Sequence, residues 1–197
     1  MLLNRAFTLS EILIAMTVIG VIAAVTVPTL MTDTSSTANR TKFKSTFVQF
    51  QTGLTHAENV QKHSFVDVGE KGTNNAKYSL DEFMGHHFNS RRIARSEDPA
   101  GMTYVLKSGA HIIFPQAAQT TMTATGCTNN NPCMIYIDVN GKTGPNEIVL
   151  CTSGATSPSL DVACTVDESV VSDIFPIRVQ KSQIYPQTNA VNYVLNH

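Results

Sequence analysis

The sequence has few charged residues, and its cations do not gather into a basic surface. Charged side chains make up 15% of the 197 residues, and the formal net charge is −1. The two basic clusters are small: Arg40, Lys42 and Lys44, and Arg91, Arg92 and Arg95. A surface that binds nucleic acid needs clustered Lys and Arg side chains to neutralise phosphates. We therefore interpret both clusters as solvated faces and disfavour nucleic-acid binding.

The short motifs that mark common catalytic sites are also lacking. The sequence contains no nucleophile elbow, no Gly-rich phosphate loop, no HExxH and no recognisable pair of catalytic carboxylates. We therefore expect neither enzymatic activity nor a cofactor.

Cysteine occurs only between positions 127 and 164, as Cys127, Cys133, Cys151 and Cys164. An even number confined to one region predicts disulfides if that region is exported. A zinc site is disfavoured because there is no CxxC pair and no histidine near the cluster. The local pairing, Cys127 with Cys133 and Cys151 with Cys164, is favoured. The rival pairing joins Cys133 to Cys151 and leaves Cys127 with Cys164.

One long apolar run is present, near the N-terminus. Ile12–Met31 contains twenty residues without a charge, which as a helix would measure about 30 Å, the thickness of a bilayer's hydrocarbon core. A secretory signal peptide has a shorter apolar stretch after clear positive charge, so an ordinary cut near Ala24 is the minor alternative. Glu11 directly precedes the run. An acid beside lipid is unfavourable without a partner, so a plain anchor does not explain it.

The segment RAFTLSEILIAMTVIGVIAAVTVP, residues 5–28, resembles the N-terminal processing and methylation segment of type IV pilins and of the pseudopilins of type II secretion. In that family a short leader is cut before a Phe, and the mature chain has Glu fifth and Pro twenty-second. Counted from Phe7, Glu11 is fifth and Pro28 is twenty-second. The resemblance implies cleavage between Ala6 and Phe7 and N-methylation of Phe7. The family usually has Gly where this chain has Ala6.

The resemblance implies a structural subunit of a type IV pilus or a type II secretion pseudopilus. The expected partners are other pilin subunits, a prepilin peptidase and an inner-membrane assembly platform. The subunit would cross the bacterial inner membrane once before assembly, and would then belong to a periplasmic pseudopilus or an extracellular pilus. Two alternatives stay open. One is a minor or tip pilin whose head binds a surface, DNA or secreted cargo, and the other is a membrane-anchored periplasmic protein with no cut after Ala6.

Four residues of this segment are candidates for assembly. Cutting before Phe7 frees an α-amino group that is cationic near neutral pH and can pair with Glu11 of a neighbouring subunit inside an apolar bundle. The alternative is that Glu11 pairs with the Phe7 amine of its own chain. Gly20 and Ala24 form a small-xxx-small pair that lets helices approach closely, unless they simply face lipid. Pro28 leaves the carbonyl of Ala24 without its helical donor and predicts a bend or a loosened turn.

Helical periodicity continues beyond the apolar run. A stripe of apolar side chains recurs at spacings of 4, 3, 4 and 3 and so shares one helical face: Phe43, Phe47, Phe50, Leu54 and Ala57. We expect this half of the helix to pack on the soluble part. The predicted organisation is a leader (1–6), a transmembrane or filament-core helix (7–31), an amphipathic helix (32–62) and a β-rich head (63–197).

The head is predicted to begin with a short helix, capped by Ser79 with Glu82. Met102–Pro115 reads as a β-hairpin turning at Lys107–Gly109. Cys133–Thr152 reads as a second hairpin, turning through NGKTGPN.

Ser172–Gln180 reads as a late strand, and its Pro176 favours a sheet edge or a bulge. The predicted fold class is therefore α+β and pilin-like. A long N-terminal helix, membrane-spanning in one half and amphipathic in the other, packs on an antiparallel sheet.

Two groups of polar side chains are candidate metal sites. Oxygen-bearing side chains lie around the second turn: Asp138, Asn140, Asn146 and Glu147. They suit calcium, but their spacing is not that of an EF-hand and tight turns use the same residues, so a structural turn is favoured. His86 and His87 are adjacent on a helix and should point apart, so a surface or subunit contact is favoured there. We expect no metal.

Overall fold

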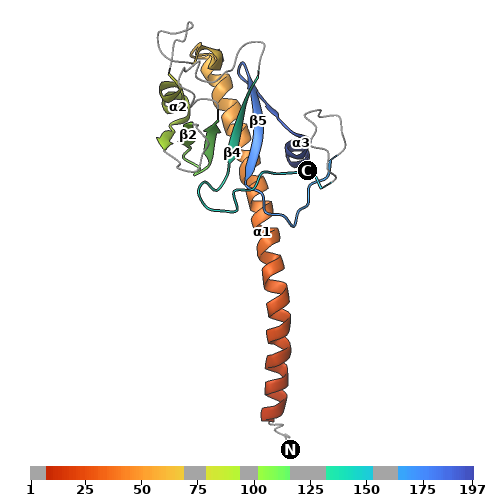
Figure 1. Cartoon of the computed structure of the whole chain (residues 1–197). Helices are drawn as coiled ribbons and strands as arrows, with labels where there is room; N and C mark the ends of the chain where they lie inside the picture. Colours follow the sequence, from red (N-terminus) through yellow and green to blue (C-terminus); the bar gives the residue numbers. More distant parts are fainter. Residues whose placement is uncertain (1–7, 69–78, 94–101, 116–131, 153–163) are drawn as a thin grey trace, which may run out of the picture.

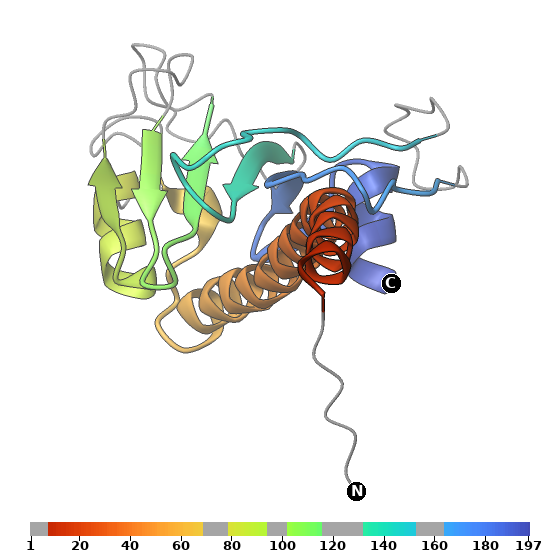
Figure 2. The same ribbon diagram turned by 90° about the horizontal axis from the view of Figure 1, so that it is seen from below.

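The computed structural model describes residues 8–68, 79–93, 102–115, 132–152 and 164–197. Its longest element is α1 (Leu9–Asn59), a helix of 51 residues. The N-terminal half of α1 projects from the head, and the C-terminal half lies against the sheet (Figure 1). Seen from below, α1 crosses one face of the sheet (Figure 2). The architecture is thus α+β with a long N-terminal helix, as predicted.

The other elements follow in chain order: η1 (Phe65–Asp67), α2 (Leu80–Phe88), β1 (Arg91–Ile93), β2 (Met102–Val105), β3 (His111–Phe114), β4 (Cys133–Asp138), β5 (Ile174–Gln180), β6 (Gln183–Pro186) and α3 (Asn189–Asn196). The six strands form one sheet in the order β1-β2-β3-β4-β5-β6, and every neighbouring pair is antiparallel. Residues 139–173 join β4 to β5. The described parts of this segment, 139–152 and 164–173, are irregular, and we call these two parts together the excursion.

The N-terminal half of α1 has the length and composition of a membrane span. Leu9–Pro28 covers 20 residues with a mean hydropathy of 2.2, and none of the span is buried within the molecule. A core helix of a water-soluble domain would be mostly buried, so its full exposure separates this segment from such a helix.

The predicted apolar stripe is the face that packs on the head. Phe43, Phe50, Leu54 and Ala57 are all buried, and Phe47 is half-buried. The ring of Phe43 stacks on Phe175 of β5 with a centroid distance of 4.2 Å. Such pairs of aromatic rings add stability beyond the area that they bury. The 3.6-residue period therefore identified the packing face correctly.

The packed face begins earlier than the stripe predicts, with the polar residues Ser36 and Asn39, which are buried. The Asn39 side-chain amide donates to the carbonyl of Ser172 at 3.2 Å. Arg40, interpreted above as part of a solvated face, instead forms an ion pair with Glu168 at 2.9 Å. Its side chain is only 17% exposed. The hydropathy pattern missed this face because its residues are polar. They are polar because the excursion, which packs on them, presents backbone carbonyls that need hydrogen-bond donors.

Two local predictions are confirmed. β2 and β3 pair with Val105 opposite His111, and the turn between them passes through Gly109, whose φ is +83°. Helix α2 starts at the predicted capping box, in which Ser79 and Glu82 exchange hydrogen bonds between side chains and backbone N–H groups. Both features are encoded within a few residues.

The second predicted hairpin is wrong. β4 pairs with β5 along all six of its residues, from Cys133 opposite Val179 to Asp138 opposite Ile174. The chain after the predicted turn makes only an isolated parallel bridge, between Ile148 and Ile174. β5 offers seven residues to β4 and buries side chains on both faces, so it forms the longer ladder.

Pro176 lies in β5 between β4 and β6, so the predicted edge position is also wrong. Its carbonyl accepts the N–H of Gln187 at 3.1 Å. The N and O atoms of a residue in an antiparallel strand face the same neighbour, so the nitrogen of Pro176 faces the side of β6. There β6 has already ended at Pro186. A residue without an N–H is tolerated where the ladder stops.

Gln51 of α1 closes the outer edge of β6. Its Nε2 donates to the carbonyl of Ser182 at 2.9 Å, and its Oε1 accepts the N–H of Ile184 at 2.8 Å. The side-chain amide thus supplies one donor and one acceptor, as a neighbouring strand would. This covers an edge that would otherwise offer unpaired backbone groups.

We expect Gln51→Ala to lower the free energy of unfolding of the head by about 1–3 kcal/mol, because it leaves two partly buried backbone groups without partners. Chemical denaturation of the full chain in detergent, followed by circular dichroism, measures this loss. Gln49→Ala is the matched control, since Gln49 is exposed and, among the described residues, its amide donates only to the hydroxyl of Ser45, at 3.5 Å. An equal loss in both variants would contradict the assigned role of Gln51.

Candidate functional site: the N-terminal helix and the polar clusters of the head

The N-terminus of α1 is held by Thr8 and Glu11. The backbone N–H and the hydroxyl of Thr8 both donate to Glu11 Oε2 at 2.8 Å. In return, the N–H of Glu11 donates to the Thr8 hydroxyl at 3.3 Å. This is a capping box, which satisfies donors that the first helical turn leaves without partners. Within one chain, the acid before the apolar run therefore caps the helix.

Sequence reasoning missed this role, although the pattern Thr-Leu-Ser-Glu, residues 8–11, is a readable capping-box signal. The alternative partner considered for Glu11, the amine of Phe7, lies outside the described residues, as do the cleavage residue Ala6 and the leader. A carboxylate offers about four acceptor positions, and Glu11 is exposed. The cap is therefore compatible with a further partner from another molecule.

The other candidate assembly residues also lie on the exposed surface of α1. A Cβ atom added to Gly20 would meet nothing within 4 Å, so nothing in the described chain requires a glycine there. Ala24 is exposed on the next turn of the same face. Pro28 lies inside α1, which continues as one helix to Asn59.

Two threonine hydroxyl groups in the apolar half form hydrogen bonds within the helix. Thr17 donates to the carbonyl of Ile14 at 2.8 Å, and Thr26 donates to that of Ile22 at 2.9 Å. A polar group inside lipid or inside an apolar bundle needs such an internal partner, because water is absent there. The threonines are therefore compatible with a membrane span.

The structure joins Cys151 to Cys164, with their Cα atoms 5.6 Å apart. This is the local pairing, so the rival pair of Cys133 with Cys151 is wrong. Cys133 is buried in β4 and is also disulfide-bonded. Its predicted partner, Cys127, lies outside the described residues.

The candidate calcium residues form a turn built on backbone N–H groups. Asp138 is fully buried, and its Oδ1 accepts the N–H of Asn140 at 3.2 Å and that of Gly141 at 2.8 Å. The side chain of Asn140 donates to the carbonyl of Gly144 at 3.2 Å. These bonds are typical of an Asx turn and support the structural interpretation of these residues.

A second buried carboxylate, Asp173, was not singled out from the sequence. Its two oxygens accept the N–H groups of Asn146 and Glu147 at 2.9 and 2.7 Å. Asn146 and Glu147 thus enter this loop through their backbone. Within the described ranges, no set of three or more His, Cys, Asp or Glu side chains is arranged to hold a metal ion.

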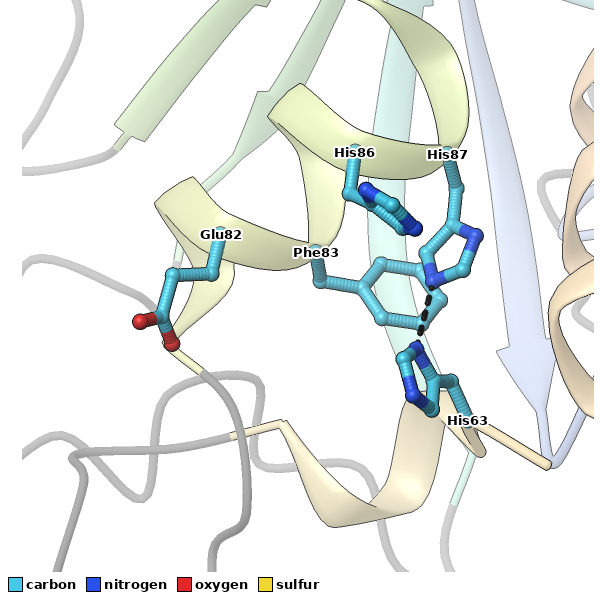
Figure 3. A pocket seen from close by; sticks show the side chains of 5 residues that line it. All are labelled: His63, Glu82, Phe83, His86 and His87. Carbon is cyan, nitrogen blue, oxygen red and sulfur yellow. Dashed lines mark hydrogen bonds between the residues drawn. The ribbon is translucent and has the colours of Figure 1, made fainter. Parts of the chain in front are cut away.

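Three histidines meet at the far end of the head. His63, which follows α1, places Nδ1 at 3.1 Å from Nε2 of His87 in α2, and a cavity of about 330 Å³ opens beside them. The rings of His86 and His87 lie 4.9 Å apart. Figure 3 shows all three imidazoles turned toward the same space, whereas the carboxylate of Glu82 points away from them. The expectation that the adjacent histidines point apart is therefore wrong, and His63 was missed.

The pKa of His87 is lowered to about 4, first by burial and then by charge repulsion from the neighbouring His86, His63 and His56. His87 is therefore neutral at physiological pH. A neutral imidazole has one donor and one acceptor nitrogen, which is what a hydrogen bond to His63 needs.

The comparison with protein families bears on the N-terminal segment. A model described as the prokaryotic N-terminal methylation motif matches residues 1–27. No curated protein matches the chain, and no solved structure does. The matched region contains Phe7, Glu11, Gly20 and Ala24 and reaches into the exposed apolar half of α1. The chain therefore carries the N-terminal methylation motif, the signature of type IV pilins and pseudopilins.

Proposed function

We propose that the chain is a structural subunit of a type IV pilus or a type II secretion pseudopilus. A prepilin peptidase would cut it between Ala6 and Phe7, and an inner-membrane assembly platform would polymerise it through α1. The observation that carries this proposal is the apolar span Leu9–Pro28, none of which is buried. The span begins at the capping box of Thr8 and Glu11, and this box lies within the residues that the methylation motif matches.

An exposed apolar surface of this size needs a cover. Large apolar side chains along the span are 47–78% exposed, from Leu9 at 78% to Val27 at 47%. Lipid can cover them before assembly, and other copies of α1 can do so afterwards. The same segment then serves as membrane anchor and as filament core, which accounts for its uniform apolar character around the helix.

Glu11 would set the register between copies. Opposite unit charges about 4 Å apart attract by about 4 kcal/mol at an effective dielectric near 20, before desolvation is subtracted. The bonds from Thr8 already satisfy part of the carboxylate, so the cap reduces the cost of burying it. The charge still needs a cation in an apolar bundle, and the α-amino group of Phe7 in a neighbouring copy supplies one after cleavage.

The continuity of α1 would place the head at a fixed distance from the bundle. A helix of 51 residues is about 77 Å long. One face of its C-terminal half packs on the head, so the head and the assembling segment would move as one body. The heads would then form the outer layer around a core of apolar helices.

Cleavage between Ala6 and Phe7 predicts a defined N-terminus for the mature chain. Mass spectrometry of the chain extracted from membranes should show Phe7 as the first residue, carrying one added methyl group. Ala6→Gly should be cut at the same bond, whereas Ala6→Leu should accumulate uncut, because the family has a small residue before the cut. An intact chain from Met1, or a cut near Ala24, would contradict the proposal.

Two substitutions of Glu11 distinguish its role in capping the helix from the role of its charge. Glu11→Gln keeps an acceptor for the capping box but removes the charge, whereas Glu11→Ala removes both. We expect both variants to insert into the membrane and to enter filaments at least about tenfold less than the wild type, the factor that corresponds to about 1.4 kcal/mol. Quantitative immunoblots of sheared filaments and membranes, in cells with the assembly machinery, measure this ratio.

Ser10→Ala is the matched control, since Ser10 is exposed in the same turn and carries no charge. It should assemble like the wild type. Normal assembly of Glu11→Gln, with a defect only in Glu11→Ala, would show that the cap matters and the charge does not, which would reject the ion pair.

A further inference from the structure

We propose that His63 and His87 form a binding site for a divalent transition-metal ion, of the class of Zn²⁺, Cu²⁺ and Ni²⁺. The site lies at the end of the head farthest from the apolar half of α1 (Figure 1). It is separate from the N-terminal segment, so it does not depend on how the subunit assembles.

The separation of the two nitrogens fits a shared ion. His63 Nδ1 and His87 Nε2 are 3.1 Å apart. Two imidazole nitrogens bound to one tetrahedral Zn²⁺ at 2.0–2.1 Å would lie about 3.3 Å apart. For a metal ion to bind both nitrogens, the proton between them would move to the other nitrogen of its own ring. The rings would separate by a few tenths of an ångström and turn their lone pairs toward an ion that lies beside the line joining the two nitrogens.

Both rings are held in place by the local fold. Lys62 adopts a left-handed conformation with φ +58°, and the N–H of His63 donates to the carbonyl of Ala57 at 2.9 Å, so the end of α1 fixes where His63 emerges. His87 packs on the ring of Phe83 at a centroid distance of 4.6 Å. Ligands fixed in this way lose little side-chain freedom when a metal binds.

The donor set selects the class of ion. Imidazole nitrogens suit zinc, copper and nickel, whereas calcium and magnesium take oxygen ligands. The carboxylate of Glu82 is turned away from the histidines (Figure 3), and no third protein ligand is in position in the described part of the chain. Water in the adjoining cavity of about 330 Å³ would complete the coordination. A bound ion would tie the end of α1 to α2 across 24 residues of sequence.

Calorimetric titration of the full chain in detergent with Zn²⁺ tests the site. We expect one ion per chain, with His63→Ala and His87→Ala each lowering the affinity at least about tenfold, since even an outer-shell partner of a metal ligand typically contributes 10- to 100-fold. His197→Ala is the control, because His197 is exposed outside the pair, and it should bind as the wild type does. Absence of saturable binding, or an equal loss in the control, would overturn the proposal.

A second measurement needs no variant. Electron paramagnetic resonance of the wild-type chain with one equivalent of Cu²⁺ counts the imidazole nitrogens that coordinate the ion. Two coordinated imidazoles are expected. A spectrum showing one imidazole or none would overturn the proposal, even if the alanine variants failed to fold.

Discussion

The stacking of Phe43 on Phe175, at 4.2 Å, fixes α1 on β5, the strand next to the β6 edge of the sheet, and the arrangement of the whole molecule depends on this contact. Glycine and several threonines lower the helix propensity of the C-terminal half of α1. Tertiary packing must therefore hold it, because most helix stability in proteins comes from a packed face. Gly53 illustrates how close the packing is, since a Cβ there would clash with the ring of Phe88.

Anchoring one half of α1 leaves the other half uncovered by the part of the chain that the structure describes. Leu9–Pro28 is not buried at all, so the free energy of covering it is available to lipid or to other copies. The capping box at Thr8 and Glu11 stabilises the start of this half in an apolar environment, because it supplies acceptors to backbone N–H groups and lipid offers none. The same chain can therefore be stable in a membrane, while a helical bundle remains an equally suitable environment.

Sequence predicted what short-range patterns encode and missed what depends on distant partners. The buried stripe of α1, the β2–β3 turn at Gly109 and the cap of α2 each follow from a few neighbouring residues. The pairing of β4 with β5 did not, because a plausible turn stands directly after β4 while the true partner lies beyond the excursion. The meeting of His63 with His87 was missed for the same reason. The relative position of these two histidines depends on how α1 and α2 pack.

The excursion explains why α1 changes chemistry along its length. The excursion, as described for residues 139–152 and 164–173, lies mostly outside the ladder, so its backbone groups need partners from side chains. Asp138 and Asp173 accept N–H groups from this segment, while Asn39 and Arg40 donate to its carbonyls. A helix that met only a sheet would need an apolar face throughout. The polar turns of α1 between the apolar span and the aromatic stripe are thus required by the irregular backbone that packs there.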